Sequence, residues 1–420
     1  MRFFLLSFLF LASCVSRSAY YADDLNLASI HLVDRDGLTE AISNEERLKN
    51  FEEIDFFTPQ PYQKVLRVFG RDVKGDTRAY ITTYHPNGQI KQYLEVINNR
   101  ACGAYREWHL NGKIKVEATI IEGSADINRA AEKSWLFDGP SKAYGENGEL
   151  IACINYCRGS LEGISLYYHS NGSIWKEIPY KNNAISGEVR IYLDSGALFQ
   201  TMHYENGLKS GKALRYWPDL MLAANEYYDQ GGLINGIYLS QEGIIIAEIK
   251  QGNGYRAVFS KEVLSELHEY HSGFPQGEVK IFNALGHLSR IYHVKNDLKH
   301  GEELFYYPSC AGELKPKLSI SWYEGKIQGL VKSWYDNQAM ESQREMSENK
   351  RNGVSTAWYR DGQLMMIEQY ENEVLKKGDY YRKGYKQPLS QVLNGEGTVT
   401  LFDSEGNYLR KIPYLNGKPD

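Results

Sequence analysis

Five of the ten histidines in the chain fall within one short stretch: His268, His271, His287, His293 and His300. Imidazole nitrogens bind zinc, copper and nickel, and Glu266 and Glu269 add carboxylates to the same stretch. A metal site would form if adjacent hairpins brought several of these side chains to one ion. The alternative is that they are solvated strand and turn residues, as His85, His109 and His169 are expected to be. We favour the second interpretation and predict neither a metal nor another cofactor.

Tryptophans are the second group of residues with a chemistry of their own. Sugar rings stack on indole faces, and five tryptophans are candidates for binding glycan or peptidoglycan: Trp108, Trp175, Trp322, Trp334 and Trp358. The alternative is an aromatic ladder between neighbouring strands, where tryptophan and tyrosine are favoured in any case. We prefer the ladder interpretation and keep glycan binding as an alternative function.

Signatures of catalysis and of nucleic-acid binding are missing from the sequence. It contains no Gly-x-x-x-x-Gly-Lys-Ser/Thr, no His-Glu-x-x-His and no Gly-x-Ser-x-Gly. Adjacent carboxylates such as Glu302 and Glu303 would point to opposite faces of a strand, which prevents an acid–base partnership. The net charge of −5 comes without a long basic run, which argues against nucleic acid. We predict that the chain is not an enzyme and has no nucleic-acid partner.

The N-terminal residues carry an export signal. Arg2 precedes a short apolar run that ends in Leu-Ala-Ser-Cys14, and this ending resembles a bacterial lipobox. The resemblance implies that residues 1–13 are a signal peptide and that Cys14 is the lipid attachment site. The implied location is the bacterial cell envelope, with the body in the periplasm or at the surface, and Val15 favours the outer membrane. The alternative is an ordinary secretory signal cleaved near Ala19 or Ala22.

Four further cysteines remain: Cys102, Cys153, Cys157 and Cys310. Export would permit disulfides, and an even count allows two of them. Cys153 and Cys157 lie four residues apart, which is too far for a bridge within one extended strand. The sequence leaves both pairing and free thiols open.

The elements that position these residues follow from a repeat of about 24 residues. Counting from a glycine, an aromatic residue follows at five, a second glycine at nine and an apolar residue at eleven. Three units define the pattern: Gly163, Tyr168 and Gly172; Gly187, Tyr192 and Gly196; Gly353, Trp358 and Gly362. Gly211, Gly301 and Gly329 keep the aromatic residue but lack the second glycine, whereas Gly236 and Gly378 lack the aromatic residue.

One such unit has the properties of a β-hairpin. A short run of strand-forming residues leads into a polar tetrad ending in glycine, such as His169-Ser-Asn-Gly172. Asn-Gly supplies the positive φ angles of tight turns, and Gly252-Asn-Gly254 and Gly395-Glu-Gly397 are also expected to be turns. Repeated hairpins predict an all-β fold, an elongated antiparallel sheet in which each unit contacts mainly its neighbours. Both faces of each strand mix polar and apolar residues, so the packed face stays open.

The repeats also divide the chain. We predict a stalk or cap at residues 14–79 and the repeat array at residues 80–420, with insertions near 123–134, 245–268 and 307–317. Residues 38–57 carry helix-forming residues and predict a short N-terminal helix. Residues 260–270 have helical spacing but also fit a longer hairpin.

The segments Tyr180-Lys-Asn-Asn-Ala-Ile-Ser-Gly187 and Tyr204-Glu-Asn-Gly-Leu-Lys-Ser-Gly211 carry the motif best. In this motif the chain resembles the MORN-repeat-variant family, which includes bacterial proteins classed as YwqK-type antitoxins. The resemblance covers residues 80–420 and implies an open β array with an interaction role and no shared catalytic residues.

These observations favour a non-enzymatic scaffold, tethered to the envelope through its N-terminal lipid, that binds a protein or cell-wall partner. The alternatives are a glycan-binding module that uses exposed aromatic residues, and a toxin-neutralising protein. The lipobox argues against the toxin-neutralising alternative, because it places the chain outside the cytoplasm.

Overall fold

The computed structural model of the chain describes residues 25–51, 58–60, 63–308 and 313–420. Strands make up about 65% of the described residues and helices about 2%, and paired strands are antiparallel. The predicted all-β fold of antiparallel hairpins is confirmed. The described residues hold no helix that is long and apolar enough to cross a membrane.

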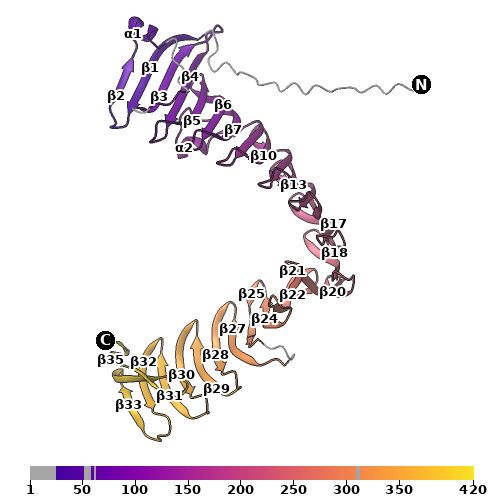
Figure 1. The fold of residues 1–420 in the computed structure, drawn as a ribbon, viewed down its shortest axis with the longest axis vertical. Coiled ribbons are helices and arrows are strands. Elements are labelled where there is room, and N and C mark those ends of the chain that lie inside the picture. Colours follow the sequence, from indigo (N-terminus) through magenta and orange to yellow (C-terminus); the bar gives the residue numbers. More distant parts are fainter. Residues whose placement is uncertain (1–24, 52–57, 61–62, 309–312) are drawn as a thin grey trace, which may run out of the picture. The chain divides into compact units, whose positions relative to one another are not determined.

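The chain divides into two compact units, residues 1–187 with 194–196, and residues 188–193 with 197–420. The first unit begins with β1, which pairs with both β2 and β3, and each later long strand pairs with the next (Figure 1). Its elements are β1 (Asn26–Asp34), β2 (Thr39–Ile42), α1 (Glu45–Lys49), β3 (Gln63–Arg71), β4 (Thr77–Tyr84), β5 (Ile90–Ile97), β6 (Arg100–Trp108), β7 (Ile114–Glu122), α2 (Arg129–Glu132), β8 (Leu136–Phe137), β9 (Gly139–Tyr144), β10 (Leu150–Cys157), β11 (Ser160–Leu161), β12 (Gly163–Tyr168), β13 (Ile174–Lys181) and β14 (Ala184–Ile185).

The boundary between the units falls in β15 (Gly187–Tyr192). The second unit contains β16 (Leu198–Glu205), β17 (Leu208–Tyr216), β18 (Leu222–Asp229), β19 (Gly232–Leu239), β20 (Ile245–Lys250), β21 (Asn253–Ser260), β22 (Val263–His271), β23 (Phe274–Phe282), β24 (Leu288–Lys295), β25 (Leu298–Lys299), β26 (Gly301–Tyr306), β27 (Pro316–Tyr323), β28 (Lys326–Trp334), β29 (Met340–Ser347), β30 (Lys350–Trp358), β31 (Leu364–Glu371), β32 (Val374–Tyr381), β33 (Pro388–Leu393), β34 (Glu396–Phe402), β35 (Tyr408–Leu415) and β36 (Lys418–Pro419).

The two glycines of the repeat have different places in a hairpin. The second glycine closes the turn: the Gly172 N–H donates to the carbonyl of His169 at 2.9 Å, with φ of 83°. The first glycine begins the strand in some units, as Gly163 does in β12, and lies inside it in others, as Gly353 does in β30. It also has a positive φ, 83° at Gly163 and 115° at Gly353. The aromatic residue ends that strand at a register shift, as Tyr168 does. Where the second glycine is missing, a residue with a side chain takes the positive φ instead, as at Leu220 (70°).

The N-terminal segment differs from its prediction. In place of one helix over residues 38–57, the structure has strand β2 followed by the five-residue helix α1, and residues 52–57 lie outside the described part. Ile42 is buried opposite Ile30 in β1, and this pairing outweighs the helical propensity of the surrounding residues. The Asn44 side chain then caps α1 by accepting from the Arg47 N–H. Antiparallel hairpins therefore begin before residue 80.

Two of the three expected insertions lie wholly within the described residues. Near residues 123–134 the chain forms α2, and Trp135 then packs on Tyr105 with ring centroids 4.9 Å apart. The segment 245–268 consists of β20, β21 and most of β22, so residues 260–270 form the longer hairpin and not a helix. At the third, the Tyr307 N–H donates to the Lys315 carbonyl, and residues 309–312 lie outside the described part.

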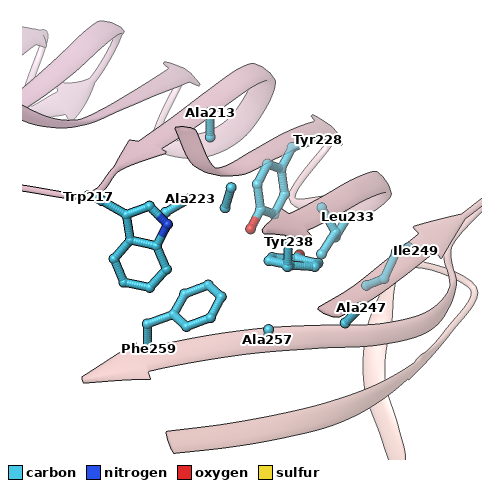
Figure 2. Packing of buried hydrophobic residues seen from close by; sticks show 11 residues of the cluster. Ala213, Trp217, Ala223, Tyr228, Leu233, Tyr238, Ala247, Ile249, Ala257 and Phe259 are labelled. Carbon is cyan, nitrogen blue, oxygen red and sulfur yellow. The ribbon is translucent and has the colours of Figure 1, made fainter. Parts of the chain in front are cut away.

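The burial of alternate side chains along each strand shows which face of the sheet is packed. In β18, Glu226 and Tyr228 are buried, whereas Tyr227 between them is 52% exposed. In β19, Tyr238 is fully buried and its neighbour Ile237 is 40% exposed. Figure 2 shows the packed side of the second unit, where Trp217 meets Phe259 edge to face at 4.7 Å. The full cluster comprises Ala213, Trp217, Ala223, Ala224, Tyr228, Leu233, Tyr238, Ala247, Ile249, Ala257 and Phe259.

Candidate functional site

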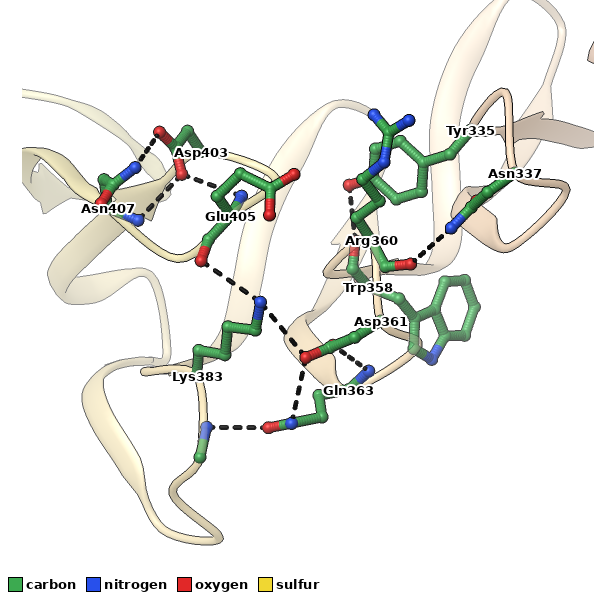
Figure 3. Close-up of polar contacts among 11 residues, drawn as sticks. Tyr335, Asn337, Trp358, Arg360, Asp361, Gln363, Lys383, Asp403, Glu405 and Asn407 are labelled. Atoms are coloured by element: carbon green, nitrogen blue, oxygen red, sulfur yellow. Dashed lines mark hydrogen bonds and ion pairs between the residues drawn. The ribbon is translucent and has the colours of Figure 1, made fainter.

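Residues beside the turns bond to the main chain of the next hairpin. The Nε2 atoms of His85 and His109 lie 2.9 Å from the carbonyl oxygens of Trp108 and Tyr144, to which they donate. Tyrosine does the same in later units: the Tyr335 hydroxyl donates to the carbonyl of Trp358 at 2.8 Å (Figure 3). These side chains are therefore structural.

The turn asparagines form a second ladder of the same kind. Their side-chain amides donate to a turn carbonyl one unit further on, at 2.8 Å from Asn87 to Leu110 and 3.0 Å from Asn337 to Arg360 (Figure 3). The asparagine oxygen accepts from the N–H two residues later, as Asn337 does from Ala339. Each asparagine thus fixes its own turn and joins it to the next.

The histidine stretch does not form a common site. His268 pairs with Glu266 at 2.5 Å and His271 with Glu269 at 3.2 Å, while the His300 ring lies 5.1 Å from that of Tyr323. Across residues 25–51, 58–60, 63–308 and 313–420 no group of three His, Cys, Asp or Glu side chains is placed to hold a metal ion. His268, His271 and His300 therefore have separate local partners.

The other sequence candidates are also dispersed. Four of the five tryptophans are half-buried, and Trp322 donates its indole N–H to buried Glu303 at 2.7 Å. Trp175 is 42% exposed, and the Lys176 ammonium lies 4.5 Å from its ring. Cys102, Cys153 and Cys157 are free thiols. Cys14 and Cys310 lie outside the described residues.

Two of the buried carboxylates, Glu226 and Glu368, carry tyrosine networks that the sequence interpretation missed. Glu226 accepts from the hydroxyls of Tyr228 at 2.9 Å and Tyr238 at 2.8 Å, and from Arg256 Nε at 2.8 Å. Burial, together with the Glu226 charge, raises the pKa of Tyr238 far above its ordinary value. The Glu226 charge also raises the pKa of Arg256 against the opposing effect of burial. The group is thus a fixed ion pair with two neutral donors.

The same arrangement recurs 142 residues later. Glu368 accepts from the hydroxyls of Tyr370 at 3.2 Å and Tyr380 at 2.8 Å. The networks occupy the two units whose glycine, Gly236 or Gly378, lacks the aromatic residue five positions on. The tyrosine two residues after each glycine lies over it, so a methyl group there would meet the tyrosine hydroxyl. The sequence signal is Glu-x-Tyr followed ten residues later by Gly-x-Tyr.

A concave pocket of about 370 Å³ opens beside Glu226 in the second unit. Arg215 and Arg256 line it together with Phe199 and Phe259. Arg215 Nη2 donates to the Phe259 carbonyl at 3.0 Å, and its guanidinium carbon lies 5.1 Å and 5.5 Å from the centroids of the Phe199 and Phe259 rings. Its Nε atom is buried and has no acceptor among the described residues. Burial, with the nearby Arg256 charge, lowers the pKa of Arg215.

Comparison with known proteins agrees with this geometry. The family model described as MORN repeat variant matches residues 101–121, 161–182 and 351–372. The first match spans most of β6 and β7, and the third spans most of β30 and β31. None of the curated proteins matches the chain. The chain is therefore a repeat scaffold that contains repeats of the MORN-variant class.

Proposed function

We propose that the chain is a non-enzymatic scaffold that is tethered to the bacterial envelope by a lipid on Cys14 and binds a protein partner through the exposed face of its sheet. The repeats support a scaffold role, because their polar residues join one hairpin to the next. The lipobox-like Leu-Ala-Ser-Cys14 supports the tether.

The observation that carries the binding proposal is the presence of exposed apolar pairs on adjacent strands. Tyr227 and Ile237 lie on adjacent strands and are diagonal neighbours, because Tyr227 pairs with Asn235 and Asn225 with Ile237. Val354 and Ile367 are related in the same way across β30 and β31, and both are exposed. Contiguous exposed apolar residues are typical of interaction surfaces, and such pairs are the places on the sheet where a partner would gain contact.

Site-specific photo-crosslinking tests the binding face. A photoreactive residue is placed at Ile237, on the face, or at Leu285, which is 76% exposed in a turn and serves as the control. Irradiation of intact cells is expected to give one discrete crosslinked protein from position 237 and none from position 285. Equal products from both positions, or none from position 237, would contradict the proposal.

The tether has a separate test. Radiolabelled palmitate is expected to label the wild-type chain and not the Cys14→Ser variant. Labelling of the variant, or lack of labelling of the wild type, would refute the lipid on Cys14 and leave the binding face untouched.

A cell-wall or other glycan partner is a second candidate, supported by the exposed indole of Trp175. Binding to a glycan array that Trp175→Ala abolishes would favour it. The toxin-neutralising alternative rests on the family resemblance alone.

A further inference from the structure

The two buried Glu–Tyr networks belong to matched modules within the second unit. Tyr228, Leu233 and Tyr238 correspond to Tyr370, Leu375 and Tyr380, all buried. Both modules also share a turn ladder: Gly273 N–H donates to the Gly252 carbonyl at 2.9 Å, as Gly417 N–H does to that of Gly395. The module that contains Glu368 therefore serves as the reference module for the one that contains Glu226.

The modules differ in charge. Near Glu226 lie the cations Arg215 and Arg256, and Lys209 whose ammonium is 4.9 Å from the Tyr228 ring. Burial, and next the Arg256 charge, lower the pKa of Lys209. Among the described residues Glu226 with Arg256 is the one ion pair in this group. Two cations thus have no carboxylate partner.

In the reference module, carboxylates outnumber cations. Arg351 occupies the place of Lys209, and it is paired with Glu373 at 3.1 Å and bonded to the Tyr370 hydroxyl at 2.7 Å. Ala357 stands in the place of Arg215, and Val399 in that of Arg256. One cation therefore faces two carboxylates, Glu368 and Glu373.

A pocket lies at the equivalent place in both modules. The reference pocket, about 260 Å³, is lined by Glu341, Ala357 and Phe402 where the first has Phe199, Arg215 and Phe259. The shared fold therefore does not require the arginines. Desolvating a guanidinium without a counter-charge is costly, so a fold that needs no arginine there keeps Arg215 at a free-energy cost.

We propose that the pocket lined by Phe199, Arg215, Arg256 and Phe259 binds the carboxylate of a peptide, either its C-terminus or an Asp or Glu side chain. The planar guanidinium fork of Arg215 matches a carboxylate, and the two phenyl rings accept the apolar group beside it. Glu226 in the pocket lining favours a singly charged carboxylate over a doubly charged phosphate. The inference does not depend on the exposed face or on the lipid.

Calorimetric titration of the purified full-length chain in non-ionic detergent tests the site. The probes are N-acetylphenylalanine, its uncharged amide, a short peptide with internal glutamates and a blocked C-terminus, and inorganic phosphate. We expect N-acetylphenylalanine to bind with a Kd on the order of a millimolar and the amide about tenfold more weakly. Binding by the glutamate peptide would place the recognised group on side chains as well.

Two variants distinguish binding at this pocket from general electrostatic attraction to the protein. Arg215→Ala introduces the residue of the reference module and is expected to weaken binding at least about tenfold without lowering the midpoint of thermal unfolding. Arg344→Ala, in the reference pocket, is expected to bind as the wild type does. Equal binding of acid and amide, equal or tighter binding of phosphate, equal loss in both variants, or no binding below about 20 mM would overturn the proposal.

Discussion

Replacing Tyr238 or Tyr380 by phenylalanine removes one hydroxyl from each buried network. The two replacements are expected to destabilise their modules unequally. A hydrogen bond to a charged group contributes about 1.5–3 kcal/mol. In Tyr238→Phe, Glu226 keeps Tyr228 at 2.9 Å and Arg256 at 2.8 Å, so the loss is expected at the lower end, about 1.5 kcal/mol. In Tyr380→Phe, Glu368 keeps the Tyr370 hydroxyl at 3.2 Å, so about 3 kcal/mol is expected.

Hydrogen exchange followed by mass spectrometry is the suitable assay, because long repeat arrays need not unfold in one step. Amides of β18 and β19 should exchange about tenfold faster in Tyr238→Phe, and those of β31 and β32 about a hundredfold faster in Tyr380→Phe. Tyr227→Phe, on the exposed face, is the control, with an expected change within about 0.5 kcal/mol. The reverse order, or an equal effect of the control, would refute the role assigned to the buried carboxylates.

Three further predictions concern turns and loops. Gly353→Ala should cost about 1.5–3 kcal/mol more than Gly362→Ala, because both glycines have positive φ but only at Gly353 does a methyl group displace the Glu345 carboxylate from the Val354 N–H. Hydrogen exchange of the neighbouring strand amides measures this difference. Leu220→Gly should raise stability by about 0.5–1 kcal/mol in the same assay, because it relieves a positive φ. Burial opposes ionisation of Asp126, but bonds from the Ile127 N–H, Arg67 and Asn128 hold its pKa below the ordinary value. The stabilisation that these bonds give is complete above about pH 4 and is lost as the pH falls through the lowered pKa of Asp126. Proteolysis of the 123–134 loop should therefore speed up at about pH 3, and it should speed up less in Asp126→Asn.

The sequence was sufficient for the hairpins because their signals are local. A glycine at a fixed distance from an aromatic residue, such as Gly163 before Tyr168, specifies a turn and a strand end within ten residues. The helix over residues 38–57 was predicted too long, because pairing of Ile42 with Ile30 depends on a strand twelve residues away. The helix propensity of residues 38–57 carries no information about that partner strand.

The pocket and the packed face were beyond the sequence for a related reason. Strand alternation gives two faces but does not say which one is covered, and only the burial of Glu226 and Tyr238 decides it. Arg215, Glu226 and Arg256 come from β17, β18 and β21, and they meet only after the intervening strands β19 and β20 have paired. The tyrosines shared by the two units that lack the aromatic residue are visible as a motif in the sequence, but the charges that surround them in the fold are not.

The most direct test of the central claim, that the regular polar residues hold the scaffold together while the exposed face binds, compares two variants with the protein crosslinked from position 237. Ile237→Arg is expected to lower affinity for that protein at least about tenfold and to leave the melting temperature unchanged. Asn337→Ala, which breaks the turn ladder to Arg360, is expected to lower the melting temperature and keep the affinity. Unchanged affinity in Ile237→Arg, or lost affinity with unchanged melting in Asn337→Ala, would contradict the account.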